Sequence, residues 1–289
     1  MVFKKTIIPI VWSVDLVEKR EMVFRSIIRY ISALAAALAL VSCTPKPKDY
    51  LEALDRGMEA QNKGDLKRAY ANYLAAYEIA DKVGNGARAV NAAWLGANTA
   101  AAIGKTDDAM KLLETALRDY RIEAPASDGR YMRNDLAVYK ARQKKYGEAA
   151  QLLKEELKRY QDKEGSFSPA FPFVPFSVMV RNLARVLAAD QWTADTETWY
   201  DDLTTRIIDN ATLNSKSAHL WMGSGAALRA LAALAKSGPR AAEAASLEEK
   251  AAEFEADESR VPAIVGERER CHTRELKAVK QTVCMLELP

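Results

Sequence analysis

The sequence predicts an all-α protein, a right-handed α-solenoid of helical hairpins that ends in a small disulfide-closed tail. Two observations carry this prediction. The chain is rich in Ala, Leu, Glu, Lys and Arg, which are strong helix formers, and alternating β-branched runs are scarce before residue 260. In addition, a pattern of small residues returns at a spacing of 40 residues. Residues 43–289 are numerous enough to bury a core of this kind.

The N-terminal segment reads as a secretory leader. Arg25 and Arg29 precede an uncharged apolar run, which ends in Leu40-Val41-Ser42-Cys43. A basic start, a short apolar middle and small residues at the cleavage point are typical of an export signal, and the run is shorter than the ~20 residues that a membrane span needs. We interpret residues 1–21 as a mis-assigned start upstream of translation at Met22, and residues 22–42 as the signal peptide.

The Leu-Val-Ser-Cys ending resembles the signal of bacterial lipoproteins. The resemblance implies that Cys43 carries the lipid (palmitate) and becomes the mature N-terminus, with residues 43–48 as a tether. It further implies a cell membrane lipid anchor facing the periplasm. Thr44, where an Asp would favour inner-membrane retention, makes the outer membrane the expected location. Five extended residues, 44–48, reach ~16 Å at roughly 3.1 Å each, so the first helix is expected near the membrane surface.

The charge balance argues against a nucleic-acid partner. The whole chain has 42 basic and 39 acidic residues, and the surplus of basic residues lies entirely before Cys43. A protein that displaces counterions from a phosphate backbone needs a basic excess, which the mature part lacks.

The repeat lies between residues 49 and 165. Ala69, Ala109 and Ala149 are 40 residues apart, and small residues at 57, 97 and 137 precede them by a constant interval. Small residues at fixed sites let two antiparallel helices approach closely, and a Gly-Asp or Gly-Lys turn reverses the chain between them. The pattern resembles the tetratricopeptide repeat, with a period longer than the 34 residues of that family and with Glu156 where a small residue is usual.

Two segments follow the repeats. In residues 166–176 proline recurs at every third position from Pro169 to Pro175, among four phenylalanines, which predicts an extended, non-helical connector. The alternative for this segment is a partner-binding strap or a plug. Residues 177–260 are expected to form further helical hairpins, with helices over 176–189, 195–209, 216–236 and 240–258.

The resemblance also implies a partner surface, because the first helix of each tetratricopeptide unit lines the concave face. The residues carried over as a peptide groove are Asn91, Trp94, Asn98, Tyr131, Asn134 and Arg142. Asparagine amides pair with a peptide backbone, and aromatic and Arg side chains supply anchors. We expect Trp94→Ala or Arg142→Ala to weaken a complex while leaving the fold intact. The alternative is that these are ordinary solvated or inter-hairpin residues.

The C-terminal tail, residues 261–289, holds a cysteine pair. Cys271 and Cys284 are the cysteines left beyond the lipidated one, and an oxidising compartment favours a disulfide between them. On one continuous helix they would lie about 20 Å apart at 1.5 Å per residue, so the bond requires a turn, near Lys277-Ala278. The second half of the tail reads equally well as a strand of a hairpin. A metal site of Cys271, His272 and Cys284 is the weaker alternative, because the spacing fits no common zinc pattern.

Catalytic motifs are not recognisable in the chain, and we expect neither enzymatic activity nor a cofactor or metal. The sequence therefore predicts a membrane-anchored periplasmic scaffold or adaptor lipoprotein that mediates protein–protein interaction in envelope assembly or secretion. Two alternatives stay open at this point. One is a lipoprotein that binds a small molecule or peptide, and the other is a cell-wall-associated enzyme or enzyme activator.

Overall fold

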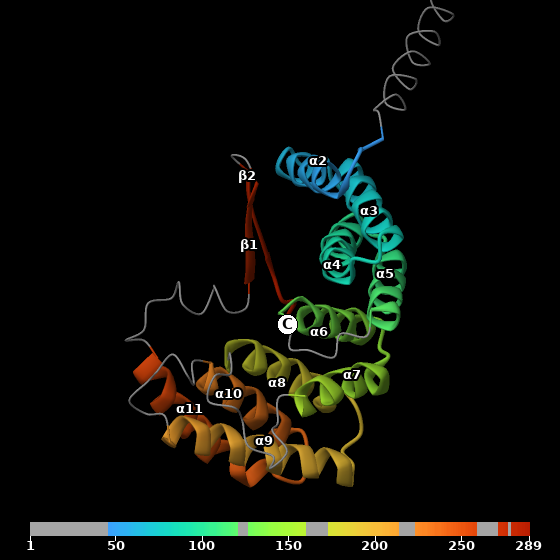
Figure 1. Ribbon diagram of the computed structural model, residues 1–289. Coiled ribbons are helices and arrows are strands. Elements are labelled where there is room, and N and C mark those ends of the chain that lie inside the picture. Colours follow the sequence, from blue (N-terminus) through green and yellow to red (C-terminus); the bar gives the residue numbers. More distant parts are fainter. Residues whose placement is uncertain (1–45, 121–126, 160–172, 214–222, 259–270, 277–278) are drawn as a thin grey trace, which may run out of the picture. The chain divides into compact units, whose positions relative to one another are not determined.

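The computed structural model describes residues 46–120, 127–159, 173–213, 223–258, 271–276 and 279–289 (Figure 1). These residues form α-helices joined mostly by short turns, one 3-10 turn and one antiparallel pair of strands. The elements are α2 (Tyr50–Asn62), α3 (Leu66–Lys82), α4 (Gly86–Ala102), α5 (Thr106–Asp119), α6 (Ser127–Arg142), α7 (Tyr146–Lys158), α8 (Phe173–Ala188), α9 (Ala194–Leu213), α10 (Ser224–Lys236), η2 (Ala241–Glu243), α11 (Ala244–Glu258), β1 (Cys271–Leu276) and β2 (Val279–Cys284). The predicted helical solenoid is confirmed.

The start and the turn of each hairpin follow from local chemistry. Asp49, Asp65 and Asn85 each accept a hydrogen bond from the backbone N–H three residues on, which caps α2, α3 and α4. Gly64 and Gly104 stand at the turns with positive φ, where a side chain would be strained. The α6–α7 turn uses the same conformation at Lys144, with φ of 62°, so the predicted turn is kept without the glycine.

Close packing of small residues against large ones holds consecutive helices together. A Cβ added at Gly57 on α2 would come within 2.5 Å of the ring of Tyr73 on α3, and Tyr73 is fully buried. Ala97 and Ala137, at the equivalent positions of the next two units, are also fully buried. Each helix from α2 to α8 contacts the helix that follows it, as a stack of hairpins requires.

The third unit replaces one small residue by an ion pair. Glu156 on α7 is 2% exposed, and its carboxylate lies 2.8 Å from the guanidinium of Arg133 on α6. The pair joins the two helices, and it supplies a partner for a charge that would be costly to bury alone.

The helical region after residue 172 corrects two predictions. α8 begins at Phe173, so residues 173–176 of the predicted connector are helical, while residues 166–172 lie outside the described residues. Pro175 is tolerated there because an N–H in the first turn has no acceptor within the helix. α10 begins only at Ser224, because Gly223 has a φ of 93°, and α10 rather than α9 is the principal neighbour of α8.

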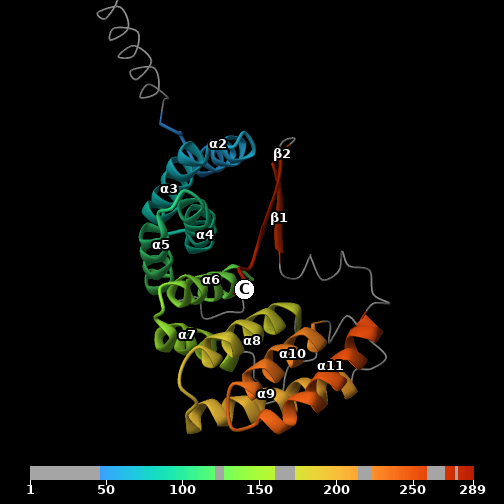
Figure 2. The ribbon, with the colours of Figure 1, turned by 180° about the vertical axis from the view of Figure 1, so that it is seen from behind.

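The predicted disulfide at the C-terminal end is confirmed, and of the two readings left open for the tail the structure shows the strand hairpin. β1 and β2 pair antiparallel with Cys271 opposite Cys284, and the two cysteines form a disulfide with their Cα atoms 3.9 Å apart. The register pairs Leu276 with Val279, and the predicted turn near Lys277-Ala278 lies outside the described residues. β2 contacts α2, and the chain then continues to α6, where its end is marked in both ribbon views (Figures 1 and 2).

The predicted leader, Cys43 and most of the tether lie outside the described residues. Within the part of the chain that the structure describes, no helix has both the length and the apolar character needed to cross a bilayer.

Candidate functional site

The site lies where the last five residues of the chain, Met285–Pro289, run along α6 and α8. We call these five residues the tail segment. We call the polar residues that hold it, Asn134 and Asp135 on α6 with Arg181, Asn182 and Arg185 on α8, the tail site. The contacts join residues more than 100 positions apart in sequence.

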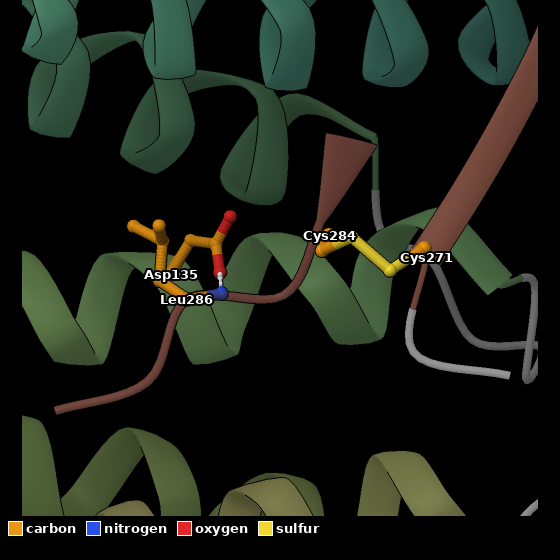
Figure 3. Close-up of a disulfide and its surroundings, with 4 residues drawn as sticks. All are labelled: Asp135, Cys271, Cys284 and Leu286. Carbon is orange, nitrogen blue, oxygen red and sulfur yellow. Dashed lines mark hydrogen bonds between the residues drawn. A yellow bond between two sulfur atoms is a disulfide. The ribbon is translucent and has the colours of Figure 1, made fainter. Parts of the chain in front are cut away.

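Asp135 is the centre of the hydrogen-bond network. It is fully buried, and its Oδ1 accepts a hydrogen bond of 2.7 Å from the backbone N–H of Leu286 (Figure 3). Its Oδ2 accepts hydrogen bonds from the Trp94 indole at 2.8 Å and from the Asn98 amide at 3.4 Å. Each of these donors is neutral. Burial among neutral donors raises the pKa of Asp135 to about 6, although the hydrogen bonds from Leu286, Trp94 and the Asn amides act to lower it.

Two buried asparagines pair with the backbone of the tail segment. The Nδ2 atoms of Asn134 and Asn182 both donate to the carbonyl oxygen of Leu286, at 2.7 and 3.0 Å. The Oδ1 of Asn182 accepts the N–H of Leu288 at 2.8 Å, and Asn182 also donates to the Oδ1 of Asn134 at 2.8 Å. Residues 286 and 288 therefore present their backbone groups to α6 and α8 in the alternating manner of an extended peptide.

The side chains of the tail segment meet complementary surroundings. The Oε1 of Glu287 lies 3.0 Å from the guanidinium of Arg181 and 2.8 Å from that of Arg185. Met285 is buried in the main apolar core, and Leu286 and Leu288 pack partly buried against it. The acidic side chain of Glu287 therefore has two arginine partners, and the leucine on each side of it packs against the apolar core.

The structure brings four of the six predicted groove residues into or around this network. Asn134 and Asn98 take part directly. Trp94 contributes its indole N–H and stacks on Tyr131, with ring centroids 5.2 Å apart. These two aromatic side chains are 1% and 4% exposed, so they are core residues. This burial contradicts the exposed position that the groove prediction gave Trp94, and we now expect Trp94→Ala to destabilise the fold.

The other two predicted residues stand apart from the tail segment. Asn91 is buried, and its Nδ2 has no hydrogen-bond partner among the described residues. Arg142 is exposed, with its guanidinium 6.0 Å from the ring centroid of Tyr139, whose hydroxyl donates to Asn98. That the six residues bind a partner stays a prediction.

Sequence reasoning missed Asp135, Arg181, Asn182 and Arg185. Asp135 directly follows the predicted Asn134, but the register of the repeat places only Asn134 on the concave face. Asn182 follows Asn134 by 48 residues rather than 40, outside the segment where the repeat is visible. The available signal was an Asn on α8, the helix that directly follows the third hairpin.

Comparison with known proteins supports the fold at low sequence identity. No protein-family model and no curated protein sequence matches the chain. Among solved structures, a variant of a Podosopora anserina protein described as a kinesin light chain with nearly identical TPR-like repeats is similar, with a TM-score of 0.53 and 18% identity over 75% of this chain and 100% of that one. A second structure under the same description has a TM-score of 0.51 and 19% identity over 72% and 96%. BtubC (BKLC) from P. vanneervenii has a TM-score of 0.50 and 16% identity over 85% and 88%.

Identities below 20% carry information on the fold alone. The chain has the fold of a TPR-like repeat protein. Three observations agree on this: the repeated hairpins, the contacts of small residues between their helices, and the similarity to these solved structures.

Proposed function

We propose that this protein is a lipid-anchored adaptor of the bacterial envelope, which binds protein partners through segments in extended conformation. TPR-like folds generally mediate protein–protein interaction, and this supports a binding role for the chain. The observation that carries the finer proposal is the pairing of Asn134, Asn182 and Asp135 with the backbone N–H and C=O groups of residues 286 and 288. Backbone groups are common to every protein, so side chains arranged in this way are suited to peptide recognition.

The proposed location rests on the sequence. The Leu40-Val41-Ser42-Cys43 signal favours lipidation at Cys43, and α2 begins at Tyr50, only seven residues later. A short tether holds the first hairpin near the membrane, where partners in envelope assembly or secretion are expected. The disulfide between Cys271 and Cys284 fits an oxidising compartment such as the periplasm.

The anchor is tested by metabolic labelling with palmitate and by membrane fractionation. The wild-type protein is expected to incorporate the label and to sediment with the outer membrane, and Cys43→Ala is expected to lose both properties. A wild-type protein without label, recovered in the soluble fraction, would contradict the anchor.

The adaptor function is tested by crosslinking the tagged protein in gently solubilised envelopes and identifying the captured proteins by mass spectrometry. Arg185→Glu reverses a charge at the tail site, and Arg68→Glu makes the same change at an exposed position of α3. We expect a partner that is captured by the wild type and by Arg68→Glu but is strongly reduced with Arg185→Glu. Equal capture by all three proteins, or no captured partner, would contradict binding through this site.

A further inference from the structure

The contacts of the tail segment resemble those of a bound peptide ligand more than those of a segment that only shields the apolar core from solvent. A segment that only shields an apolar core needs only apolar contacts. The tail segment instead contacts three polar residues, Asn134, Asp135 and Asn182, each of which is fully buried. Buried amides and carboxylates cost free energy unless they are hydrogen-bonded. Their hydrogen bonds to the backbone of residues 286 and 288 supply that compensation here, and any other extended peptide supplies the same groups.

The side-chain contacts select among such peptides. Between the apolar contacts of Leu286 and Leu288, two guanidinium groups converge on the single carboxylate of Glu287. The side chains of Arg181 and Arg185 are 18% and 35% exposed, so these charges lie near the surface, within reach of an incoming segment. Two guanidinium groups that converge on one point favour a peptide with an acidic residue at that position and disfavour one with a basic residue there.

We propose that the tail site recognises an extended partner segment with an acidic residue between two large apolar residues, and that Met285–Pro289 is the chain's own occupant, which such a segment displaces. This inference rests on the proposed adaptor function and adds the chemistry of the partner to it. The disulfide closes the hairpin at Cys284, immediately before the segment (Figure 3), and it roughly halves the covalent path from Glu258 at the end of α11 to Cys284, because the path then passes through Cys271. A short tether of this kind gives the segment an effective concentration on the order of millimolar at its own site.

The experiment measures binding of a fluorescein-labelled peptide, Gly-Ser-Met-Leu-Glu-Leu-Pro-amide, to the full chain in mild detergent by fluorescence anisotropy. Glu287→Lys places a positive charge against Arg181 and Arg185 and so weakens the internal occupant. Glu249→Lys makes the same charge change at an exposed position of α11 and serves as the control. We expect Glu287→Lys to bind the peptide roughly tenfold more tightly than the wild type and the control do.

Two further variants separate charge recognition from an effect on folding. Deletion of residues 285–289 is expected to raise affinity for the peptide in the same way, without introducing a lysine. Arg185→Glu combined with Glu287→Lys is expected to restore the internal occupant, which is read as slower hydrogen exchange at residues 285–288 than in Glu287→Lys alone, because Arg185→Glu by itself weakens binding of the acidic peptide. Thermal unfolding of each variant shows whether the helices remain intact.

The proposal is overturned if both Glu287→Lys and the deletion variant stay folded and bind the peptide no better than the wild type. It is also overturned if the wild type proves to be a dimer that exchanges tail segments, because the site is then filled by a second copy. A partner whose capture depends on Arg185, together with failure of the peptide to bind, would leave the adaptor function standing and refute only the recognition pattern.

Discussion

The burial of Asp135 leads us to expect that the contribution of this residue to stability falls as the pH rises from about 4 to about 6. Its pKa is raised from 3.8 to about 6, because the carboxyl group is buried beside neutral donors. The perturbation is a change of pH between 4 and 7, compared between the wild type and Asp135→Asn, which cannot titrate at this position.

The sign follows from proton binding. In the native state the carboxyl group keeps its proton up to about pH 6, whereas in the unfolded chain it loses the proton near pH 4, so the native state binds more protons between these values. The contribution of Asp135 to stability is therefore fully present below about pH 4 and is lost as the pH rises to about 6. A difference of roughly two pKa units corresponds to about 3 kcal/mol in the free energy of unfolding.

Urea unfolding followed by circular dichroism measures this effect. The free energy of unfolding is determined at several pH values for both proteins, and the wild-type value minus the Asp135→Asn value is plotted against pH. Subtraction removes the titration of the other carboxylates. The asparagine introduces an amide next to the donors of Trp94 and Leu286, which shifts the whole curve but not its slope.

We expect the difference to fall by about 3 kcal/mol between pH 4 and pH 6.5 and to stay level above that. A difference that is constant over the whole range would refute the reasoning, because it would mean that Asp135 ionises in the native state as it does in the unfolded chain. A rise with pH would require a cation beside the carboxylate.

Three other predictions concern the fold. Trp94→Ala removes a fully buried side chain and one donor of the buried carboxylate, so we expect a loss of about 3–5 kcal/mol in urea unfolding, in contrast to the small change expected of a surface residue. Lys144→Gly relieves a positive φ and should raise stability by about 0.5–1 kcal/mol, while Gly104→Ala at the matching turn should lower it by a similar amount; thermal unfolding that moves both variants in the same direction would contradict this. Reduction of the Cys271–Cys284 disulfide removes a loop constraint worth about 3 kcal/mol, and we expect hydrogen exchange at residues 285–289 to become faster while exchange in α4 is unchanged; equal exchange in both redox states would show that the segment docks without the crosslink.

Much of the helical architecture could be predicted because its causes are local and periodic. The residues near Ala69, Ala109 and Ala149 recur at 40 residues since each hairpin meets the same packing problem as the one before. The disulfide could be predicted from two cysteines and the length limits of a helix. Two boundaries were predicted wrongly. The proline in the first turn of α8 is compatible with a helix, and α10 begins at Ser224 after Gly223, while residues 216–222 of the helix predicted over 216–236 lie outside the described residues.

The candidate site was predictable only in part. Asn98 and Asn134 stand at positions that the repeat assigns to an inner surface, so their type and position could be recognised. The burial of Trp94 could not be predicted. Whether a tryptophan on the inner surface contacts solvent depends on which other residues pack over it. Here the carboxylate of Asp135 and the ring of Tyr131 take that place.

The sequence by itself determined the repeated hairpins, their turns and the crosslinked end of the chain, because each depends on residues close together or on a repeated spacing. Only the tertiary structure decided that Leu286 and Leu288 lie on Asn134, Asp135 and Asn182. Those contacts join positions 104 to 152 residues apart. These contacts produce no repeated pattern in the sequence, because one segment pairs once with two helices. Where that segment lies depends on the packing of the whole stack of helices.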